Sequence, residues 1–163
     1  MSQHTRFHRR TLLARLAAGS LGIPALTALA RASEATAGDA LNLIPWPKSV
    51  ERREGSLKLR AVARIVAADE SLAPLTEVLA AEIEAVAGLK LAPAEGIPPR
   101  PGDVVLQLDP AMDEEQYRLT VTDRAHVVGG SYAGVAAGTV TLLQAISAQD
   151  GVVALPQMTV ADA

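Results

Sequence analysis

The residues that could support chemistry in this chain are few, and none of them stands in a pattern that performs a reaction unaided. A glycine-rich run, Gly129-Gly130-Ser131-Tyr132-Ala133-Gly134, separates a strand-like segment from a helix-like one, which is where phosphate-binding loops occur. Its spacing is not G-x-G-x-x-G, and no Lys-Ser/Thr pair follows it as in a P-loop. We therefore interpret the glycines as a tight turn with close packing and assign no cofactor-binding residue.

Clustered carboxylates are the next candidates, as a cation site or as an acid–base pair. They are Asp109, Asp113, Glu114 and Glu115 in a turn, and Glu77, Glu82 and Glu84 on a predicted helix. The turn lacks the alternating ligands, central glycine and distal glutamate of an EF-hand. Neighbouring carboxylates on one exposed element do not flank a glycosidic bond, which needs two groups about 5–10 Å apart across a cleft. Both groups are interpreted as solvated surface.

The remaining reactive side chains are isolated. His126 is the only histidine outside the N-terminal segment and the chain has no cysteine, so no zinc site with the usual ligands is predicted. Ser131 lacks the G-x-S-x-G context of a nucleophile. A sugar platform would need exposed aromatic faces, but Tyr117 and Tyr132 are predicted to face the core, which leaves Trp46. No catalytic residue and no metal ligand is assigned.

The first 37 residues are predicted to be an export signal of the twin-arginine type. Arg9 and Arg10 precede an Ala/Leu-rich run over 12–30, and two small-residue cleavage patterns follow, at 28–30 and 35–37. The run is interrupted by Arg15, Gly19, Ser20, Gly22 and Pro24. It is therefore too broken for a stable membrane anchor, and the absence of cysteine excludes a lipid-modified one. We expect a periplasmic or extracellular protein.

Charge and length limit what the rest of the chain can be. Removing residues 1–37 takes away five Arg and one Glu, which leaves 126 residues with 10 basic and 17 acidic side chains. A domain with a net charge of −7 and no basic stripe is a poor partner for nucleic acid or an anionic membrane. The length suits one domain with its own core.

The hydrophobic patterns predict strands interspersed with two helices. Strands are expected at 62–68, 103–108, 117–122, 126–129, 152–155 and 158–163, with a small hairpin of 49–53 and 56–59 around Glu54-Gly55. The segment 91–102 is expected to be a proline-rich connection. The helices are expected at 71–87 and at about 132–148.

The two predicted helices differ in character. In the first, the apolar residues on one face are Leu72, Leu75, Leu79, Ile83 and Val86. Pro74 suits the first turn, Asp69 or Ser71 is the expected N-cap, and Gly88 suits the end. In the second, Gly134 and Gly138 share one side, although each glycine costs about 1 kcal/mol in a helix interior. We expect them to bring the helix axis close to the sheet. Its apolar face is predicted to comprise Tyr132, Val135, Thr139, Leu142, Leu143 and Ile146.

The ordered set of segments resembles the N-terminal, non-catalytic domain of bacterial β-N-acetylhexosaminidases of glycoside hydrolase family 20. The similar segments are 43–50 (LIPWPKSV), 54–59 (EGSLKL), 115–121 (EQYRLTV), 132–144 (YAGVAAGTVTLLQ) and the Leu155-Pro156 pair. Together they place an accessory domain over 40–163. The resemblance implies an α+β fold, a mostly antiparallel sheet with two α-helices packed on one face.

The resemblance also implies a partner, the catalytic (β/α)₈ barrel of the same enzyme. In that family an Asp–Glu pair of the barrel acts together with the N-acetyl group of the substrate, and neither residue has a counterpart in this sequence, which ends where the barrel would start. The chain is thus expected to be inactive alone, to need no cofactor, and to expose an apolar docking patch on the sheet face that the helices leave open. The alternatives are a standalone periplasmic binding or interaction module and the accessory domain of another barrel glycosidase, such as an α-glucuronidase.

Overall fold

The computed structural model describes residues 41–162, so the predicted signal segment with Arg9 and Arg10 lies outside the described residues. The strands are β1 (Ser49–Leu59), β2 (Arg64–Ala67), β3 (Ala92–Glu95), β4 (Val104–Leu108), β5 (Tyr117–Val121), β6 (Ala125–Gly129), β7 (Ser147–Gln149) and β8 (Val152–Asp162). The helices are α1 (Ala73–Ala87) and α2 (Tyr132–Ala145), and a short 3₁₀ turn, Glu70–Leu72, precedes α1. No described helix is long and apolar enough to cross a membrane.

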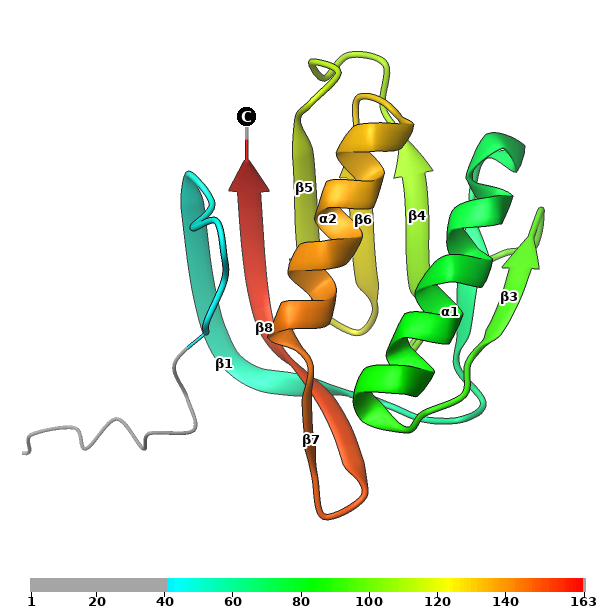
Figure 1. The fold of residues 1–163 in the computed structure, drawn as a ribbon, viewed down its shortest axis with the longest axis vertical. Helices are drawn as coiled ribbons and strands as arrows, with labels where there is room; N and C mark the ends of the chain where they lie inside the picture. Colours follow the sequence, from blue (N-terminus) through cyan, green and yellow to red (C-terminus); the bar gives the residue numbers. More distant parts are fainter. Residues whose placement is uncertain (1–40, 163) are drawn as a thin grey trace, which may run out of the picture. The chain divides into compact units, whose positions relative to one another are not determined.

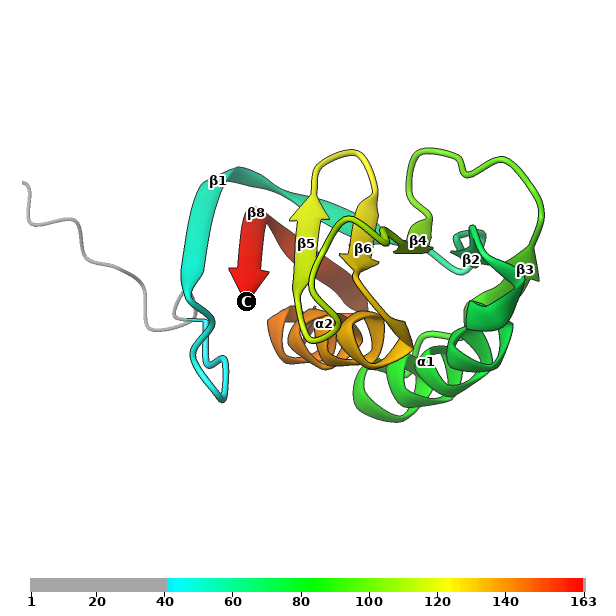
Figure 2. The ribbon, with the colours of Figure 1, turned by 90° about the horizontal axis from the view of Figure 1, so that it is seen from above.

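The described strands form one mixed sheet in the order β1-β8-β5-β6-β4-β2-β3, with β7 added beside β8 (Figure 1). Pairing is antiparallel between β1, β8, β5 and β6 and between β7 and β8, whereas β6, β4, β2 and β3 run parallel. Seen from above, α1 and α2 lie on the same face of the sheet (Figure 2). The predicted α+β class, with a mostly antiparallel sheet and two helices on one face, is confirmed.

Helix α1 packs on the sheet through large aliphatic side chains. Leu72, Leu79 and Ile83 are fully buried and Leu75 nearly so, while Val86, which was expected on the same face, is 61% exposed. Each fully buried side chain of this kind contributes about 1.5–3 kcal/mol. Pro74 lies in the first turn, as predicted, because its missing N–H costs little there.

The ends of α1 are fixed differently from each other. Asp69 or Ser71 was expected to cap the helix, but neither does, and the residue at the N-cap position is Leu72. The Asp69 carboxylate instead accepts a hydrogen bond from the Leu108 amide of β4, 3.0 Å away, and so ties the start of the helical segment to the sheet. At the other end Gly88 adopts φ 66° and its N–H donates to the Glu84 carbonyl, as a glycine terminator does.

Helix α2 ends at Ala145, three residues earlier than predicted, because the next residues form β7 against β8. Its buried face is also rotated from the predicted one. Gly134, Gly138, Thr141 and Ala145 are buried beside Val135, Thr139 and Leu142, whereas Tyr132 is 44% exposed and faces solvent. The small residues, more than the apolar ones, turn toward the sheet.

The predicted hairpin at 49–59 is wrong. Ser49–Arg52 and Ser56–Leu59 both pair with β8 instead of with each other, so they form one long strand with a register shift at 53–55. Gly55 sits in that irregularity with φ 104°, a conformation that side-chain-bearing residues rarely adopt. The two predicted C-terminal strands likewise merge into the single β8, through Pro156.

The proline-rich connection 91–102 contains a strand that the sequence analysis missed. Ala92–Glu95 forms β3, which pairs in parallel with β2 at the edge of the sheet. An edge strand tolerates Pro93 because one of its sides needs no hydrogen-bond donor. The strand is short, and the prolines in and around it favour the prediction of a loop.

Candidate docking surface

The glycine turn between β6 and α2 is filled by protein. A Cβ on Gly130 would collide with the carbonyl oxygens of Asp113 and Met112, and one on Gly129 would lie 2.5 Å from the Val135 nitrogen. The Gly130 amide already donates to the Gln116 carbonyl at 3.1 Å. The turn is therefore structural, as interpreted from the sequence, and its backbone is committed to contacts with the loop before β5.

Ser131 acts as the N-cap of α2 and not as a nucleophile. Its Oγ accepts from the Gly134 amide at 3.2 Å and donates to the Glu114 carbonyl at 2.6 Å. This serves one of the free amides at the helix start and joins the helix to the preceding loop. No base is bonded to the hydroxyl.

Along α2, the glycines bring helix and sheet into direct contact. A Cβ on Gly138 would lie 2.5 Å from Val127 Cγ1 and 3.1 Å from the Tyr117 ring, and one on Gly134 would lie 2.5 Å from the Gln116 carbonyl oxygen. Tyr117 is buried as predicted, and its hydroxyl lies 2.7 Å from Thr141 Oγ1. Burial raises the pKa of Tyr117, with the negative charge of Asp162 adding to the effect and the Thr141 hydrogen bond opposing it. The close approach expected from the glycines is confirmed.

The carboxylate groups form no cleft. Glu77, Glu82 and Glu84 are exposed on α1, while Asp109 and Asp113 accept hydrogen bonds from the Ala111 amide and the Gln116 side chain within their turn. Within residues 41–162 no group of three or more His, Asp or Glu side chains is arranged to hold a metal ion. These carboxylates are exposed to solvent on the helix or hydrogen-bonded within their own turn.

His126 lies in β6, on the sheet face away from the helices. Its Nε2 is 2.9 Å from Gln107 Oε1 of the neighbouring β4. Burial lowers the pKa of His126, and the positive charge of Arg124 lowers it further. The lowered pKa favours the neutral imidazole, which pairs with the amide side chain of Gln107.

The structure also shows a feature that was not predicted, a loop at 43–47 that Gln144, near the end of α2, holds in place. Gln144 Oε1 accepts from the Ile44 amide at 2.7 Å and its Nε2 donates to the Ile44 carbonyl at 3.0 Å. Leu43 and Pro47 are buried on either side. Between these anchors Ile44 is 77% exposed and Trp46 63% exposed. Two large apolar side chains are therefore held out into solvent by a fixed backbone.

Helix α2 continues this apolar surface. Tyr132, Ala136, Val140 and Gln144 are four residues apart and so form one row along the helix, and Tyr132 and Val140 are 44% and 49% exposed. We call Ile44, Trp46, Tyr132 and Val140 the α2 surface. Val78 and Val86 of α1 are also exposed on this side of the domain. Exposed apolar groups that are gathered in this way mark sites of protein contact.

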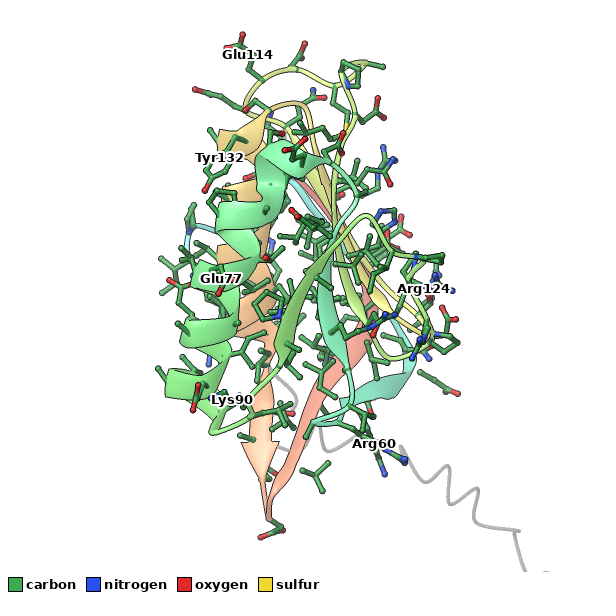
Figure 3. All side chains as sticks on the ribbon, turned by 90° about the vertical axis from the view of Figure 1, so that its right-hand side faces the viewer. Arg60, Glu77, Lys90, Glu114, Arg124 and Tyr132 are labelled. Carbon is green, nitrogen blue, oxygen red and sulfur yellow. The ribbon has the colours of Figure 1, made fainter. Side chains whose placement is uncertain are left out.

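The predicted apolar patch on the open sheet face is absent from the described residues, so that prediction is wrong. Register places Gln107, Val128, Arg118 and Ala161 in one row of this face, and Val105, His126, Thr120 and Thr159 in the next. Val105 is buried, and none of the large exposed apolar residues of the described part belongs to these two rows. Figure 3 shows Tyr132 on the helix side and Arg124 on the opposite side. The docking candidate therefore belongs to the helix side.

Comparisons with known proteins identify the family of the domain. The family model for domain 2 of glycosyl hydrolase family 20 matches residues 40–163. The chain belongs to this family. A search of curated proteins gave no match.

Solved structures share the fold. The chain resembles a family 20 exo-β-N-acetylglucosaminidase from Vibrio harveyi, with TM-score 0.66 and 18% identity, over 74% of this chain and 19% of that one. It also resembles the β-N-acetylhexosaminidases of Streptomyces coelicolor A3(2), with TM-score 0.61, 24% identity and coverage of 71% and 25%, and of Bacteroides fragilis, with TM-score 0.61, 20% identity and coverage of 76% and 25%. The chain thus spans a fifth to a quarter of the length of these proteins.

Proposed function

We propose that this domain is the non-catalytic accessory domain of an exported β-N-acetylhexosaminidase, and that its role is to pack on and stabilise the catalytic barrel of that enzyme. The proposal is supported by the family membership. Hydrolysis of terminal N-acetylhexosamine residues is assigned to the barrel that the family resemblance implies.

The single observation that carries the docking role is the α2 surface. Two hydrogen bonds from the Gln144 side chain fix the backbone that holds Ile44 and Trp46 in solvent, beside a row of exposed apolar residues. Exposure of apolar side chains to water is unfavourable, so this arrangement does not stabilise the isolated domain. Burial of these side chains against a second apolar surface would be favourable, by about 25 cal/mol per Å² of apolar area removed from water.

Catalytic silence is tested by assaying the purified chain on a chromogenic N-acetylglucosaminide. We expect no turnover above the buffer background at any pH between 4 and 9. Turnover that survives repurification, and that disappears on heating with the unfolding of the domain, would show that the chain itself is a hydrolase.

The docking role is tested in a chimaera in which residues 40–163 replace the corresponding domain of the Streptomyces coelicolor enzyme. Val140→Asp and Trp46→Asp should lower the unfolding temperature of the chimaera, because each places a charge in the interface. The same substitutions should leave the isolated chain unchanged, because both side chains are exposed there. Val62→Asp is the matched control, at a residue that is 86% exposed in the turn after β1. Equal effects of all three substitutions would refute the assigned surface.

Export is a separate part of the proposal, and it rests on the sequence of residues 1–37. Replacing Arg9 and Arg10 together with Lys should retain the chain in the cytoplasm, as read by fractionation of the producing bacterium. The Arg31→Lys variant serves as the control. Unchanged export of the double variant would remove the twin-arginine assignment and leave the docking role untouched.

A further inference from the structure

A second surface lies on the side of the domain opposite the helices (Figure 3). A hollow of about 440 Å³ lies between the end of β1, the turn that follows it, and the loop from β3 to β4. Three cationic side chains from these segments line it: Lys58, Arg60 and Arg100. Figure 3 shows Arg60 on the side of the domain opposite Tyr132 and Glu77, so the hollow would stay open when the helix side is covered.

The backbone that carries these cations is fixed by one buried carboxylate. Asp103 is 2% exposed and accepts hydrogen bonds from the Arg100 amide at 2.8 Å, from the Arg64 amide at 3.0 Å and from the Arg64 guanidinium. Although burial opposes it, these hydrogen bonds hold the pKa of Asp103 below its usual value. The β3–β4 loop and the start of β2 are thereby locked together, and the hollow has a defined shape before any ligand arrives.

The carboxylate that fixes the hollow does not neutralise its cations. Asp103 is the only acidic residue in the lining, and its charge is balanced by Arg64. No residue in the range 41–162 forms an ion pair with Lys58, Arg60 or Arg100. The hollow therefore carries three uncompensated positive charges in a domain whose overall balance is acidic. Like charges that share a site repel each other, and a bound anion would relieve that repulsion.

We propose that this hollow binds an oxyanion of the phosphate or sulfate class, carried as an ester on a larger molecule. Arg60 and Arg100 each offer a planar fork of donors that matches such a group, and Lys58 adds a third charge. The volume exceeds that of a single ion, and Val62 and Pro101 supply apolar lining for the body of the ligand. This is a pocket for one charged group, and the repulsion from the net negative charge of the domain is screened by salt beyond about 10 Å.

The test is a titration of the ¹⁵N-labelled chain with inorganic pyrophosphate at constant ionic strength, followed by amide chemical shifts and by calorimetry. We expect saturable binding, with shifts confined to residues 57–63 and 100–103. Each of Lys58→Gln, Arg60→Gln and Arg100→Gln should weaken binding about two- to fivefold, as loss of one exposed charge pair does. Inorganic phosphate and sodium sulfate, compared in parallel arms, separate the two classes, because preferential binding of phosphate identifies the phosphate class, whereas equal binding identifies oxyanions in general.

Lys90→Gln and Arg118→Gln are the matched controls, since both remove an exposed cation outside the hollow. They should leave the affinity unchanged. All five substituted side chains are exposed, so near-UV circular dichroism should show each variant folded like the parent. The proposal is overturned if no anion saturates the chain, or if the two controls weaken binding as much as the three variants of the hollow.

Discussion

The two helices lie on the same face of the same sheet but reach it by opposite means. Helix α1 inserts leucine and isoleucine side chains into the core, whereas α2 removes side chains so that its backbone meets the sheet directly. The outer surfaces differ as well, because α1 carries glutamates and α2 carries the row that ends at Gln144. Because glycines occupy part of the inward face of α2, Tyr132 and Val140 face outward while Val135 and Leu142 stay buried, and the two exposed residues belong to the candidate docking surface.

The largest effect is expected on the α1 side of this comparison. Leu79→Ala removes a fully buried side chain, so the free energy of unfolding should fall by about 2–5 kcal/mol in chemical denaturation. The neighbouring Val78→Ala, at a half-exposed position, should change it by less than about 0.5 kcal/mol. Similar losses for the two variants would contradict packing through one buried stripe.

The corresponding change in α2 adds atoms instead of removing them. Gly138→Ala should lower the free energy of unfolding by about 1–3 kcal/mol, even though alanine favours helix, because the new Cβ would overlap Val127 and press on Tyr117. Ala137→Val, which enlarges the adjacent exposed position, is the control and should change it little. A more stable Gly138→Ala protein would show that α2 does not need the close approach.

The Gln144 clamp should make a smaller contribution. Gln144→Ala removes two hydrogen bonds from a solvent-accessible site, so the free energy of unfolding should fall by about 1 kcal/mol. The specific sign is faster amide exchange at Ile44 and a change in the emission of Trp46, the only tryptophan in the chain. Gln149→Ala, at an exposed site in β7, should alter neither.

The smallest expected effect is the pH dependence of stability that Tyr117 contributes at the contact between α2 and the sheet. Tyr117 has a raised pKa in the folded state, so its contribution is intact below the ordinary tyrosine pKa of about 10 and is lost as the pH rises through the folded value. Stability should therefore decline at alkaline pH more steeply in the parent than in Tyr117→Phe. Parallel decline of the two proteins above pH 10 would assign the effect to other groups.

Much of the fold could be predicted from the sequence because its patterns are local. The period of α1 and the alternation of Tyr117, Leu119 and Val121 directly reflect burial on one side of an element. The errors arise where long-range contacts decide. Residues 49–59 carry a hairpin signal at Gly55 but pair with β8, one hundred residues away, and β3 exists because β2 offers it an edge.

The candidate docking surface could not be predicted from the sequence. Tyr132 was expected in the core because its spacing places it on the predicted apolar face of the helix, but Gly134 and Gly138 occupy the inward face and leave Tyr132 exposed. Gln144 looked like an ordinary polar residue near a helix end, and only the fold brings it to Ile44. The open sheet face was expected to be apolar, but its rows contain arginine, histidine, glutamine and threonine.

The central claim, that the α2 surface is the docking site for a catalytic barrel, is tested most directly by hydroxyl-radical footprinting. Oxidation of Trp46 and Tyr132 would be compared between the isolated chain and the chimaera with the Streptomyces coelicolor enzyme, with Val62 as the internal reference. We predict at least a fivefold loss of modification at Trp46 and Tyr132 in the chimaera, and an unchanged rate at Val62. Equal modification of Trp46 and Tyr132 in both proteins would contradict the account.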